Sequence, residues 1–215
     1  ANLTELTLPA NLLVMEKNAF GNTSKLTKVN VYSVSQDINF EYAAFGTTTT
    51  SVSTAPTYYV KDLFIAKEVT IFDITGVFGS KVLANVTVEE GNDNYTSIEG
   101  VLFDKDVTKI VYYPTQREGN YVLPETVVEI GDKVFESKTG ITSITIGKNV
   151  KLIGTSAFAN CSKLEEVIFE EGGTEELVIG AMAFQSCSAL TTLQLPLRLT
   201  QILDAAFKAC KSIMK

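Results

Sequence analysis

The feature that most constrains the fold of this chain is a repeat in its second half. An Ala-Phe or Val-Phe pair recurs there at intervals of 23, 26 and 23 residues, with its aromatic rings at Phe135, Phe158, Phe184 and Phe207. A cysteine follows each of the last three rings at a distance of three residues, as Cys161, Cys187 and Cys210. Self-similarity at a fixed period of about 20 to 50 residues is typical of solenoids, in which each repeat forms one coil.

Each repeat also contains a short run in which apolar residues alternate with other residues. These runs are 121–124, 144–147, 167–170 and 193–196. Alternation with period two, a bias to β-branched or aromatic residues and, in most runs, a closing Pro or Gly predict a very short strand. The Ala-Phe segment lacks this alternation and predicts a single helical or 3₁₀ turn. We therefore expect each repeat to run as strand, turn, helical turn and loop.

A single repeat of this length cannot enclose its own apolar side chains. Stacked repeats can, because equivalent side chains then lie over one another and form a continuous core column. The short strands of neighbouring coils would pair in parallel about 4.8 Å apart and form a long sheet along one face. The sequence thus predicts an α/β solenoid with short parallel strands on one face and short helical turns and loops on the other.

The first half of the chain carries the same pattern less regularly. The pairs Ala19-Phe20, Ala44-Phe45 and Val77-Phe78 keep its phase. The Thr/Ser tract 47–56 has little to bury and predicts a loop between coils. The β-rich runs 100–103 and 108–114, on either side of the polar residues 104–106, predict an inserted β-hairpin. We predict one solenoid domain over residues 1–215, irregular and with insertions over 1–120 and regular over 121–215.

The repeat resembles a known family. The string Leu-x-Leu-Pro, then Ile-Gly, then Ala-Phe-x-x-Cys-x-x-Leu is similar to the BspA-like leucine-rich repeats, and so is the interruption from 92–95 through 100–103 to 113–114. The resemblance covers nearly the whole chain. It implies a right-handed solenoid and, commonly, a bacterial cell-surface or secreted protein that adheres to host matrix, host cells or other microbes. The family brings no catalytic residues, so none is assigned here.

Charge and composition narrow the function further. The 25 acidic and 18 basic side chains give a formal net charge of -7, which repels nucleic-acid phosphates and anionic lipid. Histidine is absent, and with it the usual general base and the commonest zinc ligand. No stretch reaches the ~20 apolar residues of a membrane span, and we expect any export signal to lie outside this sequence. We expect a protein without catalytic residues, metal or other cofactor, and the family resemblance implies an extracellular or cell-surface location.

Two groups of residues could nevertheless carry chemistry. The cysteines occur once per repeat without a CxxC pair, so we interpret them as small buried side chains that fill one column rather than as nucleophiles or ligands. The carboxylates Glu165-Glu166, Glu170-Glu171 and Glu175-Glu176 could serve acid/base hydrolysis of a glycan. Because they flank Gly172-Gly173 in the longest repeat, we interpret them as part of a solvated loop.

The remaining candidate is the exposed side of the predicted sheet. In each strand the residue between two inward apolar positions must point outward. The predicted partner-binding residues of this row are Asn30, Phe64, Thr87, Thr145, Ile168 and Gln194, with Thr7 and Val122 in the same row and Val111 and Tyr113 added from the inserted hairpin. Adhesive surfaces use such a mixture of polar groups with a few apolar anchors. The alternative is that Thr and Val stand there only because they favour strands.

Three functions are open on this evidence. The first is a non-enzymatic module that binds a host or microbial surface protein or glycan through this row, without binding nucleic acid or inserting into a membrane. The second is a passive spacer or stalk within a larger surface protein. The third is a carbohydrate-active enzyme that uses the glutamate cluster.

Overall fold

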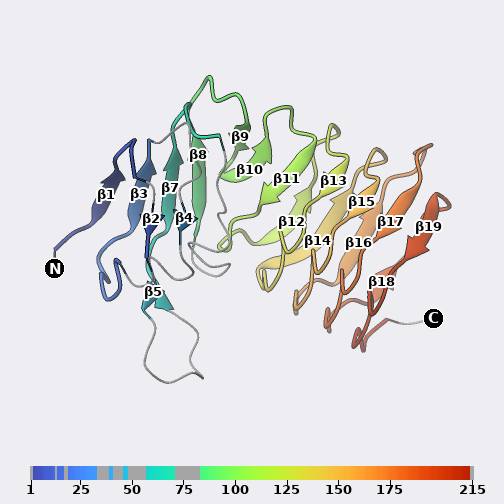
Figure 1. Cartoon of the computed structure of the whole chain (residues 1–215). Coiled ribbons are helices and arrows are strands. Elements are labelled where there is room, and N and C mark those ends of the chain that lie inside the picture. The colour runs from blue at the N-terminus through green and yellow to red at the C-terminus, as the bar shows by residue number, and fades with distance from the viewer. Residues whose placement is uncertain are drawn as a thin grey trace. The chain divides into compact units, whose positions relative to one another are not determined.

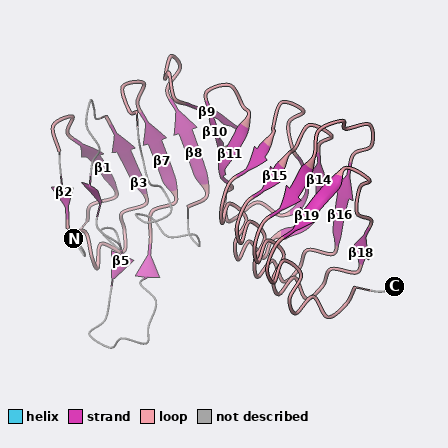
Figure 2. Ribbon diagram, turned by 45° about the vertical axis from the view of Figure 1, so that its right-hand side comes forward, coloured by secondary structure: helices cyan, strands magenta, loops and turns pink. Residues whose placement is uncertain are grey.

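The structure is a computed structural model of the chain, which describes residues 2–12, 14–16, 19–32, 39–40, 46–47, 57–70 and 83–213 (Figure 1). It divides into two compact units, residues 1–105 and 106–215. The described residues form strands, turns and loops, and none of them is helical (Figure 2). The predicted helical turns are therefore wrong. Each unit contains parallel strands from successive coils, and the fold is a parallel β-solenoid.

The first unit is built on a parallel sheet of four strands. These are β1 (Glu5–Leu8), β3 (Lys28–Val31), β7 (Asp62–Ile65) and β8 (Asn85–Val88). The register aligns Val29, Leu63 and Val86 in one buried row. Two smaller pairs belong to the same unit: β2 (Val14–Met15) runs parallel to β4 (Asn39–Phe40), and β5 (Gly46–Thr47) runs antiparallel to β6 (Thr57–Tyr58).

Part of the predicted first half lies outside the described residues. This applies to the pairs Ala44-Phe45 and Val77-Phe78 and to residues 48–56 of the Thr/Ser tract. The ends of that tract are described, because Thr47 and Thr57 face each other in the antiparallel pair of β5 and β6. Phe20, in the first pair, is described and half-buried.

The inserted hairpin is present but lies earlier in the chain than predicted. It consists of β9 (Tyr95–Ile98) and β10 (Val101–Asp104), which are antiparallel. The connecting residues Glu99 and Gly100 both have positive φ, 49° and 80°, the conformation that matches the twist of a tight hairpin. The run 108–114 forms β11 (Lys109–Tyr112) instead, which pairs in parallel with β13 (Glu129–Ile130) and thereby buries Ile110 against the next coil.

One buried amide fixes the start of this hairpin. The Nδ2 of Asn92 donates to the carbonyl oxygens of Ala66 at 2.9 Å and Val69 at 3.0 Å, one coil earlier. Its Oδ1 accepts from the backbone N–H groups of Asn94 and Tyr95, both at 2.8 Å. A buried amide must be hydrogen-bonded to be tolerated, and this one joins the hairpin to the coil that contains β7.

In the second unit each coil contributes two strands, whereas the sequence predicted one. The predicted strands form the sheet of β12 (Gly119–Val122), β14 (Ile141–Ile146), β16 (Glu166–Phe169) and β18 (Thr192–Leu193). The others are β11, β13, β15 (Leu152–Ile153), β17 (Leu177–Ile179) and β19 (Leu199–Ile202). Ile110, Ile130, Ile153 and Ile179 align across this second set and are fully buried. Strands as short as β13 and β15 show no alternation, so periodicity alone missed them.

A glycine follows several of these second strands because the backbone of the preceding coil passes close to it. A Cβ on Gly154 would lie 2.7 Å from the backbone nitrogen of Asp132, and one on Gly180 would lie 2.7 Å from the carbonyl oxygen of Ile153. Backbone atoms cannot rotate away as the end of a side chain can. The Ile-Gly pair of the repeat is therefore a packing requirement between coils.

The third side of each coil carries the predicted aromatic column. The rings of Phe135, Phe158, Phe184 and Phe207 stack in sequence, with centroids 4.6, 4.9 and 5.2 Å apart and planes within 8° of parallel. The first three of these rings are fully buried. Each ring covers the face of the next, so the column gains both apolar burial and aromatic contact energy.

Left-handed residues explain why this third side is not helical. Ser156 and Asn160 flank the segment around Phe158 with φ angles of 55° and 61°, and the other coils repeat the pattern at Lys133 and Ser137, Met182 and Ser186, and Ala205 and Ala209. A side chain at positive φ cannot continue a right-handed helix. The chain therefore makes consecutive tight turns.

These turns leave alternate N–H groups free to reach the next coil. The N–H groups of Ala157, Ala159 and Cys161 donate to carbonyl oxygens three residues back in their own coil. Those of Ser156, Phe158 and Asn160 donate to Ala181, Ala183 and Gln185 of the next coil, at 2.9, 2.7 and 2.8 Å. The turn side is thus hydrogen-bonded between coils much as the sheets are, and its buried backbone groups are satisfied.

A lysine takes the cysteine position in the first regular repeat. Lys138 follows Phe135 by three residues, and its side chain is buried. Its Nζ donates to Thr115 Oγ1 at 3.0 Å and to the Tyr112 hydroxyl at 3.5 Å, and it lies 4.6 Å from the centroid of the Tyr112 ring. Burial lowers the pKa of this amine from 10.5 to about 7.

The aromatic column predicts a large loss of stability for Phe158→Ala. The substitution leaves a cavity between the rings of Phe135 and Phe184, and we expect the free energy of unfolding to fall by about 3 to 5 kcal/mol. Guanidinium unfolding followed by circular dichroism measures this. Ile168→Ala, at an exposed position, should change it by less than about 1 kcal/mol. An unfolding midpoint of Phe158→Ala equal to that of the wild type would contradict the column.

The buried amine predicts a pH dependence of stability. Between pH 7 and 10.5 the unfolded chain holds a proton on Lys138 that the folded chain has lost. The free energy of unfolding should therefore rise with pH across this window, by about 1 kcal/mol per pH unit from Lys138 alone. This gain in stability should disappear as the pH falls back toward 7.

Lys138→Met isolates this contribution from those of other titrating groups. Guanidinium unfolding at several pH values measures the free energy of unfolding of both proteins. As the pH rises, the wild type should gain stability relative to the variant. A difference that is constant from pH 7 to 10.5 would show that the amine keeps its ordinary pKa in the folded protein.

Candidate binding face

The second unit presents the predicted outer row on the sheet of β12, β14, β16 and β18. The register aligns Val122, Thr145 and Ile168, while the inward neighbours Ile144, Ile146 and Val167 are buried. Val122 is 62% exposed and Ile168 is 42% exposed, with the half-buried Thr145 between them. Gln194 follows β18 directly and is exposed. The predicted alternation is confirmed in β14 and β16, but not after β18, where Leu195 was predicted to point inward and is 40% exposed.

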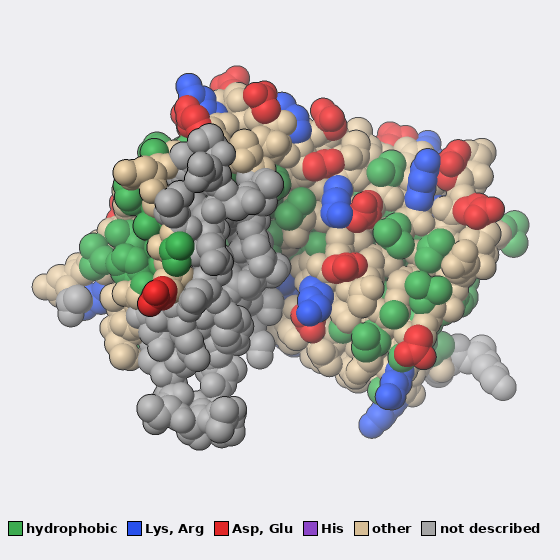
Figure 3. Space-filling model, in the orientation of Figure 1, with side chains coloured by type: hydrophobic (Ala, Val, Ile, Leu, Met, Phe, Trp, Pro, Cys, Tyr) green, Lys and Arg blue, Asp and Glu red, His purple; other side chains and the backbone are tan. Residues whose placement is uncertain are grey.

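A shallow groove of about 420 Å³ adjoins the row at the ends of three successive strands. Its lining residues are Val122, Leu123, Glu125, Lys148, Glu170 and Glu171. Its two apolar residues are the buried Leu123 and the exposed Val122, which we call the floor. The charged side chains come from the turns after β12, β14 and β16. The side of the second unit visible in Figure 3 shows hydrophobic side chains dispersed among acidic and basic ones.

The rim of the groove is held by contacts between coils. Lys148 Nζ lies 3.0 Å from Glu125 Oε1, and Glu170 Oε2 accepts the backbone N–H of Lys148 at 3.3 Å. The hydrogen bond with Glu125 raises the pKa of Lys148, so this cation is fully charged at neutral pH. Glu171 has no polar partner among the residues that the structure describes. The sequence identified the glutamates but treated them as part of a solvated loop.

Glu170 and Glu171 follow β16 directly, at the start of the loop that makes this repeat three residues longer than its neighbours. The loop turns at Gly172, which has a φ of 85°, and then passes close to the preceding coil at Gly173. A Cβ on Gly173 would clash with the carbonyl oxygen of Lys148 and would lie 2.7 Å from Arg198 Cδ. Arg198 crosses this glycine, and its guanidinium donates to the carbonyl oxygens of Val150 and, at 3.2 Å, Gly147.

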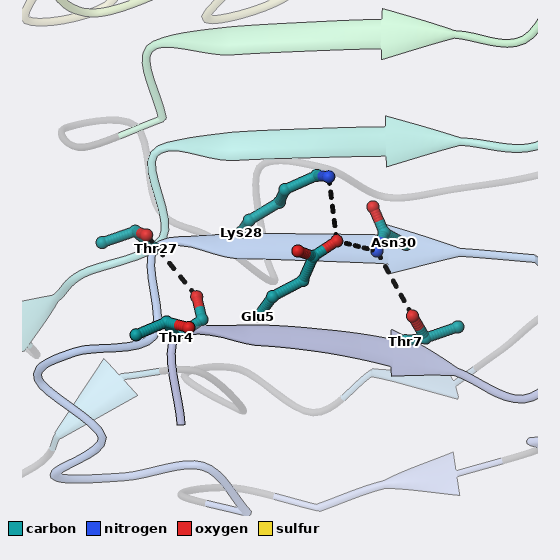
Figure 4. A network of polar contacts seen from close by, with 6 residues as sticks. All are labelled: Thr4, Glu5, Thr7, Thr27, Lys28 and Asn30. Atoms are coloured by element: carbon teal, nitrogen blue, oxygen red, sulfur yellow. Dashed lines mark hydrogen bonds and ion pairs between the residues drawn. The ribbon is translucent and has the colours of Figure 1, made fainter. Parts of the chain in front are cut away.

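In the first unit the predicted row is also aligned, but its polar groups are paired with one another. The register places Thr7, Asn30, Phe64 and Thr87 side by side on adjacent strands. Asn30 is only 7% exposed, because its Nδ2 donates to Glu5 Oε1 at 2.7 Å and to Thr7 Oγ1 at 3.3 Å (Figure 4). The prediction that the side chain of Asn30 is exposed is therefore wrong.

The neighbouring charges and rings complete this paired surface. Glu5 Oε1 also lies 2.8 Å from Lys28 Nζ, and this contact lowers the pKa of Glu5 and raises that of Lys28. Phe64 is half-buried, and its ring centroid lies 5.5 Å from that of Tyr32. Thr87 is exposed at the end of the row.

The two residues predicted from the inserted hairpin do not join the row. Tyr113 is buried, because its ring packs against Phe135 at a centroid distance of 4.6 Å and against Tyr121 at 4.9 Å. Desolvation raises the pKa of its hydroxyl. Val111 is half-buried on β11, which pairs with β13 and not with the strands of the row. Both predictions followed from placing this run in a hairpin.

The cysteines fill one column, as predicted. Cys161 and Cys187 are buried, and their Sγ atoms donate to the carbonyl oxygens of Phe135 and Phe158 at 2.9 and 3.1 Å, one coil earlier. Cys210 is half-buried and makes the same bond to Phe184 at 3.0 Å. Hydrogen bonding to Cys161 raises the pKa of Cys187 to about 12, and hydrogen bonding to Cys187 raises that of Cys210. Such thiols stay protonated at neutral pH and are poor nucleophiles.

Among the described residues, no cluster of three or more Cys, Asp and Glu side chains could hold a metal ion. Glu175, one of the candidate acid/base residues, is ion-paired with Lys151 at 3.1 Å on the surface. The same part of the chain contains no helix with the length and hydropathy to cross a bilayer.

The coils stack so that their short strands pair in parallel and their equivalent apolar side chains form columns. This is the architecture of a leucine-rich-repeat solenoid. The family model described as "BspA type Leucine rich repeat region" matches residues 1–116 and 110–215 in 6 copies. The chain therefore belongs to the BspA-type leucine-rich repeat family. Repeats of this family form binding or structural modules, as in bacterial surface proteins, and are generally not enzymes. Among curated proteins no match was found.

Two solved structures are similar over almost the whole chain. The pneumococcal vaccine antigen PcpA shares 28% sequence identity and a TM-score of 0.69, over 94% of this chain and 47% of its own. A leucine rich cell surface protein from Faecalibacterium prausnitzii A2-165 shares 26% identity and a TM-score of 0.69, over 98% of this chain and 52% of its own. The chain thus spans about half the length of these relatives.

The cysteine column predicts slow reaction with thiol reagents in the folded protein. Buried, hydrogen-bonded thiols should react only when a coil opens, so we expect Cys161 and Cys187 to label at least about 100-fold more slowly than in guanidinium. The rate of absorbance change with a disulfide reagent at pH 8, with peptide mapping, measures this. Cys210 should be the first to react. Immediate labelling of Cys187 in the native protein would contradict the buried column.

Proposed function

We propose that this protein is a non-enzymatic, extracellular or cell-surface binding module, which recognises a surface protein or glycan through the outer row of the second unit. We define this outer row as Val122, Thr145, Ile168 and Gln194. The observation that carries the proposal is the exposure of Val122 and Ile168 in register beside a groove. Single exposed aliphatic side chains need no explanation, but a strip of them next to a hollow is a surface that a partner can cover.

The relatives support this setting. One of the similar structures is described as a vaccine antigen and the other as a cell surface protein, and both share the solenoid over almost all of this chain. Solenoids of this kind bind partners across several coils, because each coil adds one side chain to a continuous row. Adhesion to a host or microbial surface is the specific form of binding that we propose.

A passive spacer is the second candidate function, and the first unit favours it. There the outer face is occupied by the contacts of Asn30 with Glu5 and Thr7, which leave fewer groups for a partner. In a spacer, the outward side chains of the strands would only stabilise contacts between coils. The exposed aliphatic side chains of the second unit would then bind no partner.

Charge placed on the outer row distinguishes these two functions. We expect the double variant Val122→Glu, Ile168→Glu to lose at least about tenfold in affinity for its partner, since both aliphatic anchors become charged and hydrated. The measurement is binding of the intact chain to arrays of matrix proteins, bacterial surface proteins and glycans, followed by titration of each hit.

Leu152→Glu is the matched control, because Leu152 is 37% exposed but belongs to the other strand set. It should keep the affinity and the unfolding midpoint of the wild type. Equal loss in the control and in the double variant would contradict the outer row as the binding surface, and an absence of binding to every array would favour the spacer.

A further inference from the structure

We infer that the groove beside the outer row binds an extended, basic segment of a partner protein, in which Lys or Arg side chains alternate with aliphatic ones. This inference rests on the proposed function, because the groove and the outer row share Val122. It adds the chemistry of the partner and the residues that would select it.

The first argument is charge. Three carboxylates, Glu125, Glu170 and Glu171, and one cation, Lys148, line the groove. Lys148 is paired with Glu125 at 3.0 Å and also attracts Glu170, whose Oε2 accepts its backbone N–H, but one cation cannot balance three carboxylates, and the rim keeps a net charge of -2 (three negative, one positive). The side chains of Glu170 and Glu171 are exposed, so an incoming cation can reach them while Lys148 stays paired with Glu125. A second cation of the partner would share Glu125 with Lys148. Such a rim attracts basic segments and repels sulfated, sialylated or phosphorylated polymers.

The second argument is the apolar surface between the charges. Val122 and Leu123 form the floor, and Ile168 continues the aliphatic strip along the outer row. An aliphatic side chain of the partner can be buried there. Its charged neighbours leave the opposite face of the extended chain, and their long, flexible Lys or Arg side chains bend back to the rim. The lining contains no aromatic ring, the surface on which sugar rings stack best, so the groove favours a peptide over a neutral glycan.

The third argument is spacing. The groove crosses the coils that contain β12, β14 and β16, so Glu125 and the pair Glu170 and Glu171 are two coils apart. Two strand spacings amount to about 10 Å. An extended chain advances about 3.3 Å per residue, which puts side chains on one face about 7 Å apart. Long Lys or Arg side chains two residues apart can span the remaining distance.

The test uses fluorescent peptides and the full chain. The probe is the hexapeptide Lys-Val-Lys-Val-Lys-Val, and the comparison peptides replace either its Lys residues by Glu or its Val residues by Ser. We expect the probe to bind in fluorescence anisotropy, more weakly as salt is raised, and both comparison peptides to bind at least about tenfold more weakly. Equal binding of the probe and the Ser peptide would overturn the role of the aliphatic floor.

Two charge-matched variants locate the contact. Glu170→Gln with Glu171→Gln should weaken binding of the probe by about tenfold or more. Glu175→Gln with Glu176→Gln changes the net charge equally outside the groove and should leave the affinity within about twofold; the exposed ion pair of Glu175 with Lys151 that it removes contributes little to stability. Equal effects of the two variants would overturn the inference, since attraction would then depend on net charge alone.

The outcomes separate this inference from the proposed function. If the array partner is a neutral glycan whose binding is lost in Val122→Glu, Ile168→Glu but kept in Glu170→Gln, Glu171→Gln, the inference fails and the proposed function stands. If the probe binds through Glu170 and Glu171 while no array partner depends on the outer row, the groove is confirmed as a site for basic segments and the proposed function fails.

Discussion

Each coil of the second unit depends on its neighbours for its backbone hydrogen bonds. The two strand sets pair in parallel, and on the turn side Phe158 and its flanking residues donate to the next coil as well. Buried N–H and C=O groups are costly when unpaired, so the coils must stay in register on all three sides. The ring stack, the cysteine column and the close approach at Gly154 all follow from that single register.

The same register leaves the outward side chains free to differ between coils, because they pair no backbone and fill no core. In the first unit those positions are used for a polar network around Asn30, which joins neighbouring strands. In the second unit they present Val122 and Ile168 beside a groove with a carboxylate rim. A repeat with one architecture thus presents two surfaces that differ in accessibility and charge, built from side chains that contribute little to the fold.

Much of the architecture could be predicted from the sequence, and the failures have physical causes. The Phe column and the cysteine column were predictable because these residues recur at a fixed spacing in the sequence, and stacked coils bring residues at such a spacing together. The two-residue strands β13 and β15 were not, because periodicity needs more residues than they contain. Tyr113 was placed on the surface because its run resembles a hairpin strand, whereas parallel pairing of β11 turns that ring toward Phe135. The prediction of helical turns failed because several residues there are left-handed. These residues, among them Ser156, Asn160 and Met182, are of different types and share no sequence pattern.

By itself the sequence determined that this chain is a leucine-rich-repeat solenoid with its aromatic and apolar residues in columns, because residues at one period must meet the same environment in every coil. Only the tertiary structure decided which outward residues are accessible. Asn30 and Ile168 occupy equivalent positions in their strands, yet one is covered by its neighbours and the other is not. Accessibility depends on side chains from adjacent coils, which lie about 23 residues away in the sequence and a strand spacing away in space.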